Sequence, residues 1–250
     1  ISGRQQALRG IDFSVPEHEF VSVIGSNGAG KSTLLSAIAG DVLPQAGTIE
    51  IGGVDVTRRP TAIRAGKVAR VFQDPLAGSC GTLSIEENLA LAAARGTNRM
   101  LGLAINRSRR EMFRQRLTEL GLGLESRLED QMGLLSGGQR QALALVMATL
   151  AGADVLLLDE HTAALDPAMA EFVLDLTQRV VQEQKVTTLM VTHSMRQALD
   201  YGDRTVMLHE GRIILDVAGQ ERSDLGVEDL IQMFRDVRGQ ETDDDSLLIE

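Results

Sequence analysis

The chain alternates short apolar runs with longer stretches in which apolar side chains recur every three or four positions. Short runs rich in Val, Ile and Leu predict buried strands, and the longer periodicity predicts helices with one buried face. The predicted strands are residues 20–24, 68–72, 155–159, 186–192, 204–208 and 212–217. The predicted helices are residues 33–39, 87–95, 107–120, 135–150, 167–184 and 227–237. Strands that alternate with helices along the chain indicate an α/β fold that contains a parallel sheet.

Two segments near the start of the chain follow a different pattern. Residues 7–15 and 48–51 alternate apolar and polar side chains, which predicts strands with one buried face. Gly52 and Gly53 follow the second segment and predict a hairpin turn. We therefore expect a small antiparallel β subdomain beside the parallel sheet.

The middle of the chain is predicted to be a helical insertion. Residues 84–151 carry helical periodicity and few strand signals, whereas both patterns alternate on either side of them. The end of the chain, residues 241–250, is rich in Asp and Glu, as solvated disordered tails commonly are. We expect one domain, with a core at 1–83 and 152–240 that includes the β subdomain, a helical subdomain at 84–151 and an acidic tail at 241–250.

The segment between the first buried strand and the first helix has the form G-x-x-x-x-G-K-S. This is the P-loop or Walker A pattern, in the strand–turn–helix context that the pattern requires. Glycines let successive N–H groups turn toward an anion, and the helix N-terminus adds its positive dipole end. Lys31 is expected to reach the β- and γ-phosphates, and the Ser32 hydroxyl to ligate Mg²⁺. The candidate nucleotide-binding residues are Gly25, Ser26, Asn27, Gly28, Ala29, Gly30, Lys31, Ser32 and Thr33.

A second apolar run, residues 155–158, ends in two acids, Asp159 and Glu160. Alone, such a run is commonly just the end of a strand, but after an intact P-loop it matches the partner that the loop needs. Asp159 is expected beside Mg²⁺ at the end of the strand. The Glu160 carboxylate can polarise the water that attacks the γ-phosphate, or accept its proton.

The segment Leu135-Ser136-Gly137-Gly138-Gln139 begins a predicted helix and allows two interpretations. Ser and Gly residues at a helix start can form an anion-facing N-terminus, or they can simply cap the helix. By chemistry alone, the N-capped helix start is the favoured interpretation.

Six motifs along residues 25–193 resemble, in kind and order, those of the ATP-binding cassette (ABC) ATPases. In this comparison, Gly25 to Ser32 resembles Walker A, Gln73 the Q-loop glutamine, Leu135 to Gln139 the signature sequence, Val155 to Glu160 Walker B, Ala164-Leu165-Asp166 the D-loop, and His193 the switch histidine. The resemblance implies a P-loop NTPase (RecA-like) core with the antiparallel β subdomain and the inserted helical subdomain.

The resemblance also implies what each motif does. Glu160, His193 and Gln73 would be catalytic, and Gln73 would share the Mg²⁺ site with Ser32 and Asp159. Two copies of the chain would dimerise head to tail and sandwich ATP at the interface. The residues that face the partner's P-loop would be Leu135, Ser136, Gly137, Gly138 and Gln139, with Asp166 in the adjoining D-loop.

A stand-alone cassette with these motifs resembles the ATPase of a bacterial importer for a small solute, with an amino-acid-like substrate as the first expectation. Its cofactors would be ATP and Mg²⁺. Its partners would be transmembrane permease subunits and an extracytoplasmic substrate-binding protein. The expected location is cytoplasmic and peripheral, on the inner face of the cell membrane. The alternative is a soluble ABC-type mechanical ATPase in translation or DNA maintenance.

Composition narrows these alternatives. The formal net charge of the 250-residue chain is −10 at pH 7, which argues against nucleic-acid binding. Cys80 is the single cysteine and forms no internal disulfide, as is typical of a reducing compartment. No apolar run approaches the roughly 18 residues of a membrane span.

The chain departs from the family pattern at two points. His161 stands where the family usually has a proline after the Walker B acids, and we interpret it as a tolerated substitution rather than a new catalytic residue. Residues 1–12 contain no aromatic side chain, although such ATPases usually stack one on adenine.

Overall fold

Within residues 6–96 and 105–238, which the computed structural model describes, six strands form the main sheet in the order β4-β5-β6-β1-β7-β8. They are β1 (Phe20–Ile24), β4 (Val68–Val71), β5 (Val155–Asp159), β6 (Thr187–Val191), β7 (Arg204–His209) and β8 (Arg212–Ala218). All neighbours pair in parallel except β7 and β8, which form an antiparallel hairpin at one edge. The predicted α/β fold with a parallel sheet is confirmed.

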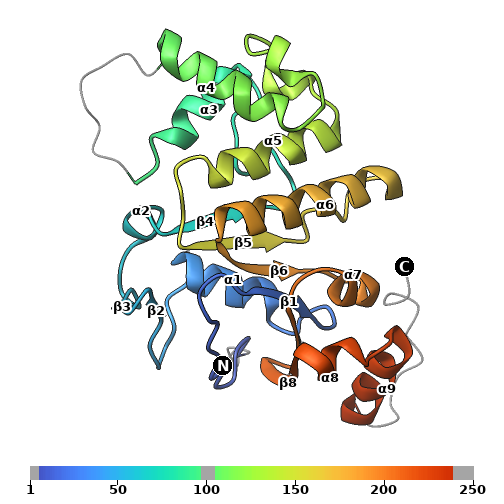
Figure 1. Ribbon diagram of the computed structural model, residues 1–250. Helices are drawn as coiled ribbons and strands as arrows, with labels where there is room; N and C mark the ends of the chain where they lie inside the picture. Colours follow the sequence, from blue (N-terminus) through green and yellow to red (C-terminus); the bar gives the residue numbers. More distant parts are fainter. Residues whose placement is uncertain (1–5, 97–104, 239–250) are drawn as a thin grey trace.

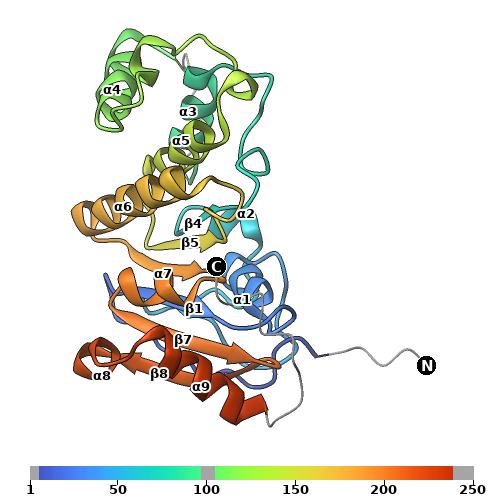
Figure 2. The ribbon, with the colours of Figure 1, turned by 90° about the vertical axis from the view of Figure 1, so that its right-hand side faces the viewer.

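Helices cover both faces of this sheet (Figures 1 and 2). Successive strand residues point to opposite faces, so Leu157 packs in the cluster with α1 (Lys31–Ala39). Leu156 and Leu158 pack in the cluster with α5 (Gly137–Thr149) and α6 (Pro167–Gln184). Helix α6 (Pro167–Gln184) has the predicted bounds. The remaining helices beside the β1–β7–β8 part of the sheet are α7 (Met195–Asp200), α8 (Gly219–Ser223) and α9 (Val227–Arg238).

The chain between β4 and β5 is helical and extends beyond the β4 edge of the sheet (Figure 1). It contains α3 (Ile85–Ala93), α4 (Arg107–Thr118), two short 3₁₀ turns at Leu124–Ser126 and Met132–Leu134, and α5 (Gly137–Thr149). Helix α3 begins two residues earlier than predicted, because Ser84 caps its first turn and the Glu87 side chain bonds back to the Ser84 N–H. Helix α5 connects this helical insertion to the sheet, because it packs against β4 and α6.

The predicted strand at residues 7–15 is wrong. Its burial does alternate as expected, with Ile11, Phe13 and Val15 half-buried and the residues between them exposed, but its backbone forms no strand ladder. A two-residue periodicity reports one buried face, and strand formation also needs a partner backbone. The predicted hairpin at Gly52-Gly53 does form, between β2 (Glu50–Ile51) and β3 (Val54–Asp55).

The sequence pattern did not predict several short elements, among them α2 (Thr61–Arg64), α7 and α8. The predicted acidic tail lies outside the described residues, as does part of the chain between α3 and α4. Of the helices that the structure describes, none has both the length and the hydrophobicity needed to cross a bilayer.

Candidate nucleotide site

The P-loop joins the end of β1 to the start of α1 and takes a backbone path that only glycine permits at two points. Gly25 has φ +144°, and a Cβ there would lie 2.1 Å from the Leu208 carbonyl oxygen on β7. Gly30 has φ +104°, and its Cβ would lie 2.6 Å from the Ala7 carbonyl oxygen. The loop therefore packs tightly between β7 and the extended N-terminal segment, and this packing holds its backbone in a conformation that can bind an anion.

Lys31 is the first residue of α1 and is 5% exposed. Its Nζ donates to the carbonyl oxygens of Gly25 at 2.6 Å and Ser26 at 3.2 Å, so the ammonium group lies inside the loop. Burial lowers the pKa of Lys31, and the nearby carboxylates of Glu160 and Asp159 partly offset that shift. The Lys31 ammonium group is desolvated inside the P-loop, and a bound phosphate would stabilise its charge.

Ser32 and Asp159 bring hard oxygen atoms together at the end of β5. Ser32 Oγ lies 3.3 Å from Asp159 Oδ1 and donates a hydrogen bond to it. A hydroxyl and a carboxylate are the ligand types that Mg²⁺ prefers. These two residues therefore fit the magnesium ion that the motif implies.

Glu160 and His193 meet beside this pair. Glu160 has φ +48°, a left-handed conformation that is uncommon outside glycine, and it turns the chain immediately after β5. Its Oε1 lies 2.7 Å from His193 Nε2, and the Glu160 side chain is 15% exposed. An unusual backbone conformation kept at a carboxylate is typical of functional sites.

A cavity of about 430 Å³ lies over the P-loop. It is lined by Gln6, Ala7, Arg9, Asn27, Gly28, Ala29, Gly30, Lys31, Ser32, Thr33, Glu160 and Glu210. The predicted phosphate-binding residues from Asn27 to Thr33 thus share one cavity with the predicted base, Glu160. Arg9 and Glu210 form an ion pair of 3.1 Å at this cavity.

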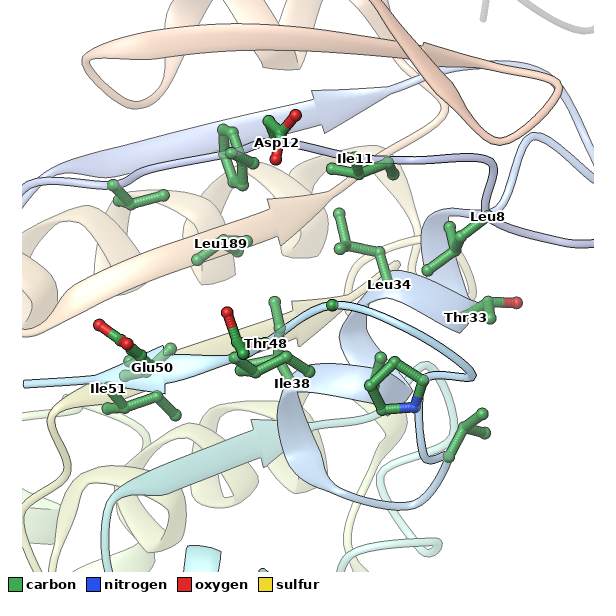
Figure 3. A pocket seen from close by; sticks show the side chains of 18 of the residues that line it. Leu8, Ile11, Asp12, Thr33, Leu34, Ile38, Thr48, Glu50, Ile51 and Leu189 are labelled. Atoms are coloured by element: carbon green, nitrogen blue, oxygen red, sulfur yellow. The ribbon is translucent and has the colours of Figure 1, made fainter. Parts of the chain in front are cut away.

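A larger cavity, of about 1290 Å³, lies between the extended N-terminal segment, α1 and β2 (Figure 3). Apolar side chains such as Leu8, Ile11, Leu34 and Ile38 line it. It shares Gln6, Ala7, Arg9 and Thr33 with the P-loop cavity. The smaller cavity is the candidate site, because the phosphate-binding and acidic groups converge there.

The remaining predicted site residues do not line the P-loop cavity. Gln73 is exposed and follows β4. Ser136 caps α5 and Asp166 caps α6, each by accepting a backbone hydrogen bond from the third residue beyond it. Leu135 is buried, and Gly138 packs so closely on Met169 that a Cβ there would lie 2.1 Å from its Cγ.

One charged residue near the site escaped the sequence analysis. Arg70, in β4, places Nη2 2.6 Å from Asp159 Oδ2. The signal was an arginine in the strand Val68–Val71, since charged side chains are rarely buried without a partner.

The chain is similar to known ATP-binding proteins in both sequence and fold. A family model described as ABC transporter matches residues 8–163. A tyrosine transport ATP-binding protein of Clostridioides difficile is 43% identical over 224 residues, which cover 90% of this chain and 89% of that protein. The sulfate/thiosulfate import ATP-binding protein CysA of Mycobacterium bovis is 40% identical over 212 residues, which cover 83% of this chain but only 56% of that protein.

Among solved structures, a dimeric ATP-binding cassette in a post-hydrolysis state with ADP and Pi is similar to this chain. The two structures superimpose with a TM-score of 0.73 at 28% sequence identity, covering 85% of this chain and 90% of the other. The same fold thus occurs with hydrolysis products bound.

The parallel sheet, the P-loop at the start of α1 and the acids at the end of β5 define a P-loop nucleoside triphosphatase. The chain belongs to the ABC transporter family, as an ATP-binding subunit of the importer type. It is an ATPase whose hydrolysis of ATP is coupled to transport. The mechanical ATPase considered from the sequence is not favoured.

Proposed function

We propose that this chain hydrolyses Mg-ATP in the P-loop cavity to power import of a small, amino-acid-like solute. The observation that carries the catalytic part is the 2.7 Å pair of Glu160 and His193 beside the P-loop. The similarity to a tyrosine transport ATP-binding protein supports an amino-acid-like substrate. The substrate itself would bind to other chains of the transporter.

In this mechanism, Glu160 is the general base. Its carboxylate accepts a proton from, or orients, the water that attacks the γ-phosphate, while the P-loop N–H groups and Lys31 hold the phosphates. His193 donates to Glu160 through Nε2 and so fixes the direction of the carboxylate. Ser32 and Asp159 would hold Mg²⁺, which neutralises charge on the β- and γ-phosphates when bound.

We further propose that the signature segment acts on the ATP of a second copy of the chain. The segment lies at the N-terminus of α5, where free N–H groups favour an anion, and it does not line this chain's own P-loop cavity. Gln141 of α5 donates through Nε2 to the Phe72 carbonyl at 3.2 Å, immediately before Gln73. That bond would couple movement of the signature helix to the Q-loop.

The partners in this proposal are two transmembrane permease subunits and an extracytoplasmic substrate-binding protein. The chain would bind the permease at the inner face of the membrane, as a peripheral subunit. Two relatives are named as transport or import ATP-binding proteins, and the similar cassette structure is a dimer, which supports this proposal.

The test is the Glu160→Gln variant, which keeps the shape of the side chain but removes the base. We expect steady-state ATP hydrolysis to fall at least about 100-fold, the lower range for loss of a general base. Mg-ATP binding should persist, and size-exclusion chromatography with light scattering should detect a stable dimer that forms only with Mg-ATP. Glu183→Gln, the same change at an exposed site on α6, is the control and should hydrolyse ATP like the parent. If Glu160→Gln also turns over at the parental rate, Glu160 is not the base.

A further inference from the structure

Arg70 lies half-buried in an unusual position for a cation, in the strand next to the Walker B strand. Its side chain is 13% exposed, and its guanidinium lies 4.7 Å from the centre of the Phe72 ring. Nη2 bonds to Asp159 Oδ2 at 2.6 Å, while Nη1 bonds to Asp41 Oδ2 at 3.0 Å. Arg70 therefore holds two carboxylates at once, one at the site and one outside the P-loop cavity.

The Asp159 carboxylate is divided between two partners. Oδ1 accepts from Ser32, and Oδ2 accepts from Arg70. The end of β5 that suits Mg²⁺ thus already carries a bound unit positive charge. Charges at this separation interact strongly where water is largely excluded.

The ion pair is not the only link between β4 and β5. The two strands already pair along their length in parallel register, with Arg70 opposite Leu157. Asp41, by contrast, lies just beyond the Gly40 cap of α1, and its side chain is 42% exposed. An arginine placed between a half-buried and an exposed carboxylate can shift its hydrogen bonding toward either one.

We propose that Arg70 is an internal counter-ion of Asp159 that competes with Mg²⁺, and that Asp41 retains Arg70 when it gives up Asp159. This inference rests on the proposed function, because it assigns Asp159 to the metal site. In the absence of the cation Arg70 neutralises Asp159 and keeps it directed at Ser32. When the cation is present, Arg70 moves its hydrogen bonding to Asp41 and Ser36, which its Nη1 already contacts.

The test measures binding of a fluorescent ADP analogue with Mg²⁺ and with EDTA, and it compares the ratio of the two affinities. Arg70→Met should raise that ratio at least about threefold, since a competing unit charge is removed from a partly buried site. Arg70→Lys keeps the charge and should stay within about twofold of the parent. Asp41→Asn should lower the ratio, because Arg70 then loses its second carboxylate. In the Arg70→Met background, Asp41→Asn should have no further effect.

The outcomes separate this inference from the proposed function. An unchanged or lowered ratio in Arg70→Met, with Mg²⁺-dependent binding intact in the parent, overturns the counter-ion role and leaves the proposed function standing. An Asp41→Asn effect of equal size with and without Arg70 overturns the role of Asp41. Binding by the parent that does not depend on Mg²⁺ removes the metal site, and both proposals fall. Should Arg70→Met not fold, as judged by thermal unfolding, an unchanged ratio in Asp41→Asn overturns the proposal.

Discussion

His161 Nε2 lies 3.1 Å from Thr177 Oγ1, and both side chains are buried between the end of β5 and helix α6. The Thr177 hydroxyl donates its one proton to the Val173 carbonyl at 2.7 Å. His161 must therefore donate through Nε2–H, which assigns the neutral tautomer from the hydrogen-bond network. Burial lowers the pKa of His161 to about 4. The residue that replaces the family's proline is a packing group and not a proton donor to the reaction.

This burial predicts a pH-dependent loss of stability. The unfolded chain binds a proton at His161 below its ordinary pKa of 6.5, whereas the folded protein resists protonation until about 4. Stability is therefore full above pH 6.5 and falls as the pH drops from 6.5 toward 4. The loss of stability reaches about 3 kcal/mol near pH 4, from a pKa lowered by roughly 2.5 at 1.36 kcal/mol for each pH unit. Urea unfolding at a series of pH values measures it.

The control for this prediction is His161→Leu, which removes the titrating group and fills its buried site with an apolar side chain. Thr177 retains its bond to Val173 in that variant. The difference in free energy of unfolding between parent and variant should change across this pH range and be constant above it. A difference that is independent of pH would contradict the assignment.

The sequence predicted those parts of the site that are contiguous in the chain. The run from Gly25 to Thr33 follows a buried strand and precedes a helix, and that local pattern is sufficient for the P-loop. Arg70 and Asp159 are 89 positions apart, so only the pairing of β4 with β5 reveals their contact. The role of His161 was likewise invisible, because it depends on Thr177 of the next helix. Residues 7–15 show the opposite error, since their alternation was correct but no strand paired with them.

Substitution of Gly138 tests whether this residue serves packing, catalysis or both. A Cβ there would lie 2.1 Å from Met169 Cγ and 2.4 Å from Met169 Sδ, so Gly138→Ala forces this side chain to move. Overpacking of this kind costs about 1–3 kcal/mol of stability. Urea unfolding of Gly138→Ala measures the cost.

The double variant Gly138→Ala/Met169→Ala removes the clash and should recover most of that stability. Recovered stability in a double variant that does not hydrolyse ATP would mean that Gly138 also contacts the partner's nucleotide, as proposed for the signature segment. Recovery of both would restrict Gly138 to packing against α6. Met169→Ala alone is the matched reference for the double variant.

Lys31→Met should weaken nucleotide binding while the protein still folds. The variant leaves the Gly25 and Ser26 carbonyl oxygens without this donor, but it also removes a desolvated cation, so stability without nucleotide should change by no more than about 2 kcal/mol. Nucleotide affinity should fall at least about tenfold, since the charge-assisted bonds to phosphate are lost. Added Mg-ATP at one fixed concentration should therefore raise the Tm of the parent more than that of the variant. A variant whose Tm rises as much as that of the parent would exclude Lys31 from phosphate binding.

Arg64 holds the far end of the P-loop helix in place. Arg64 is 1% exposed, and its guanidinium donates to the carbonyl oxygens of Ala37, Ile38, Thr57 and Arg59. Two of these carbonyls lie in the last turn of α1, where a cation also interacts favourably with the negative end of the helix dipole. Arg64→Met leaves all four without this donor and should destabilise the fold by about 2–5 kcal/mol in urea unfolding. Arg59→Met, at an exposed side chain, should change stability by less than about 0.5 kcal/mol, and equal effects of the two variants would mean that the buried bonds contribute nothing.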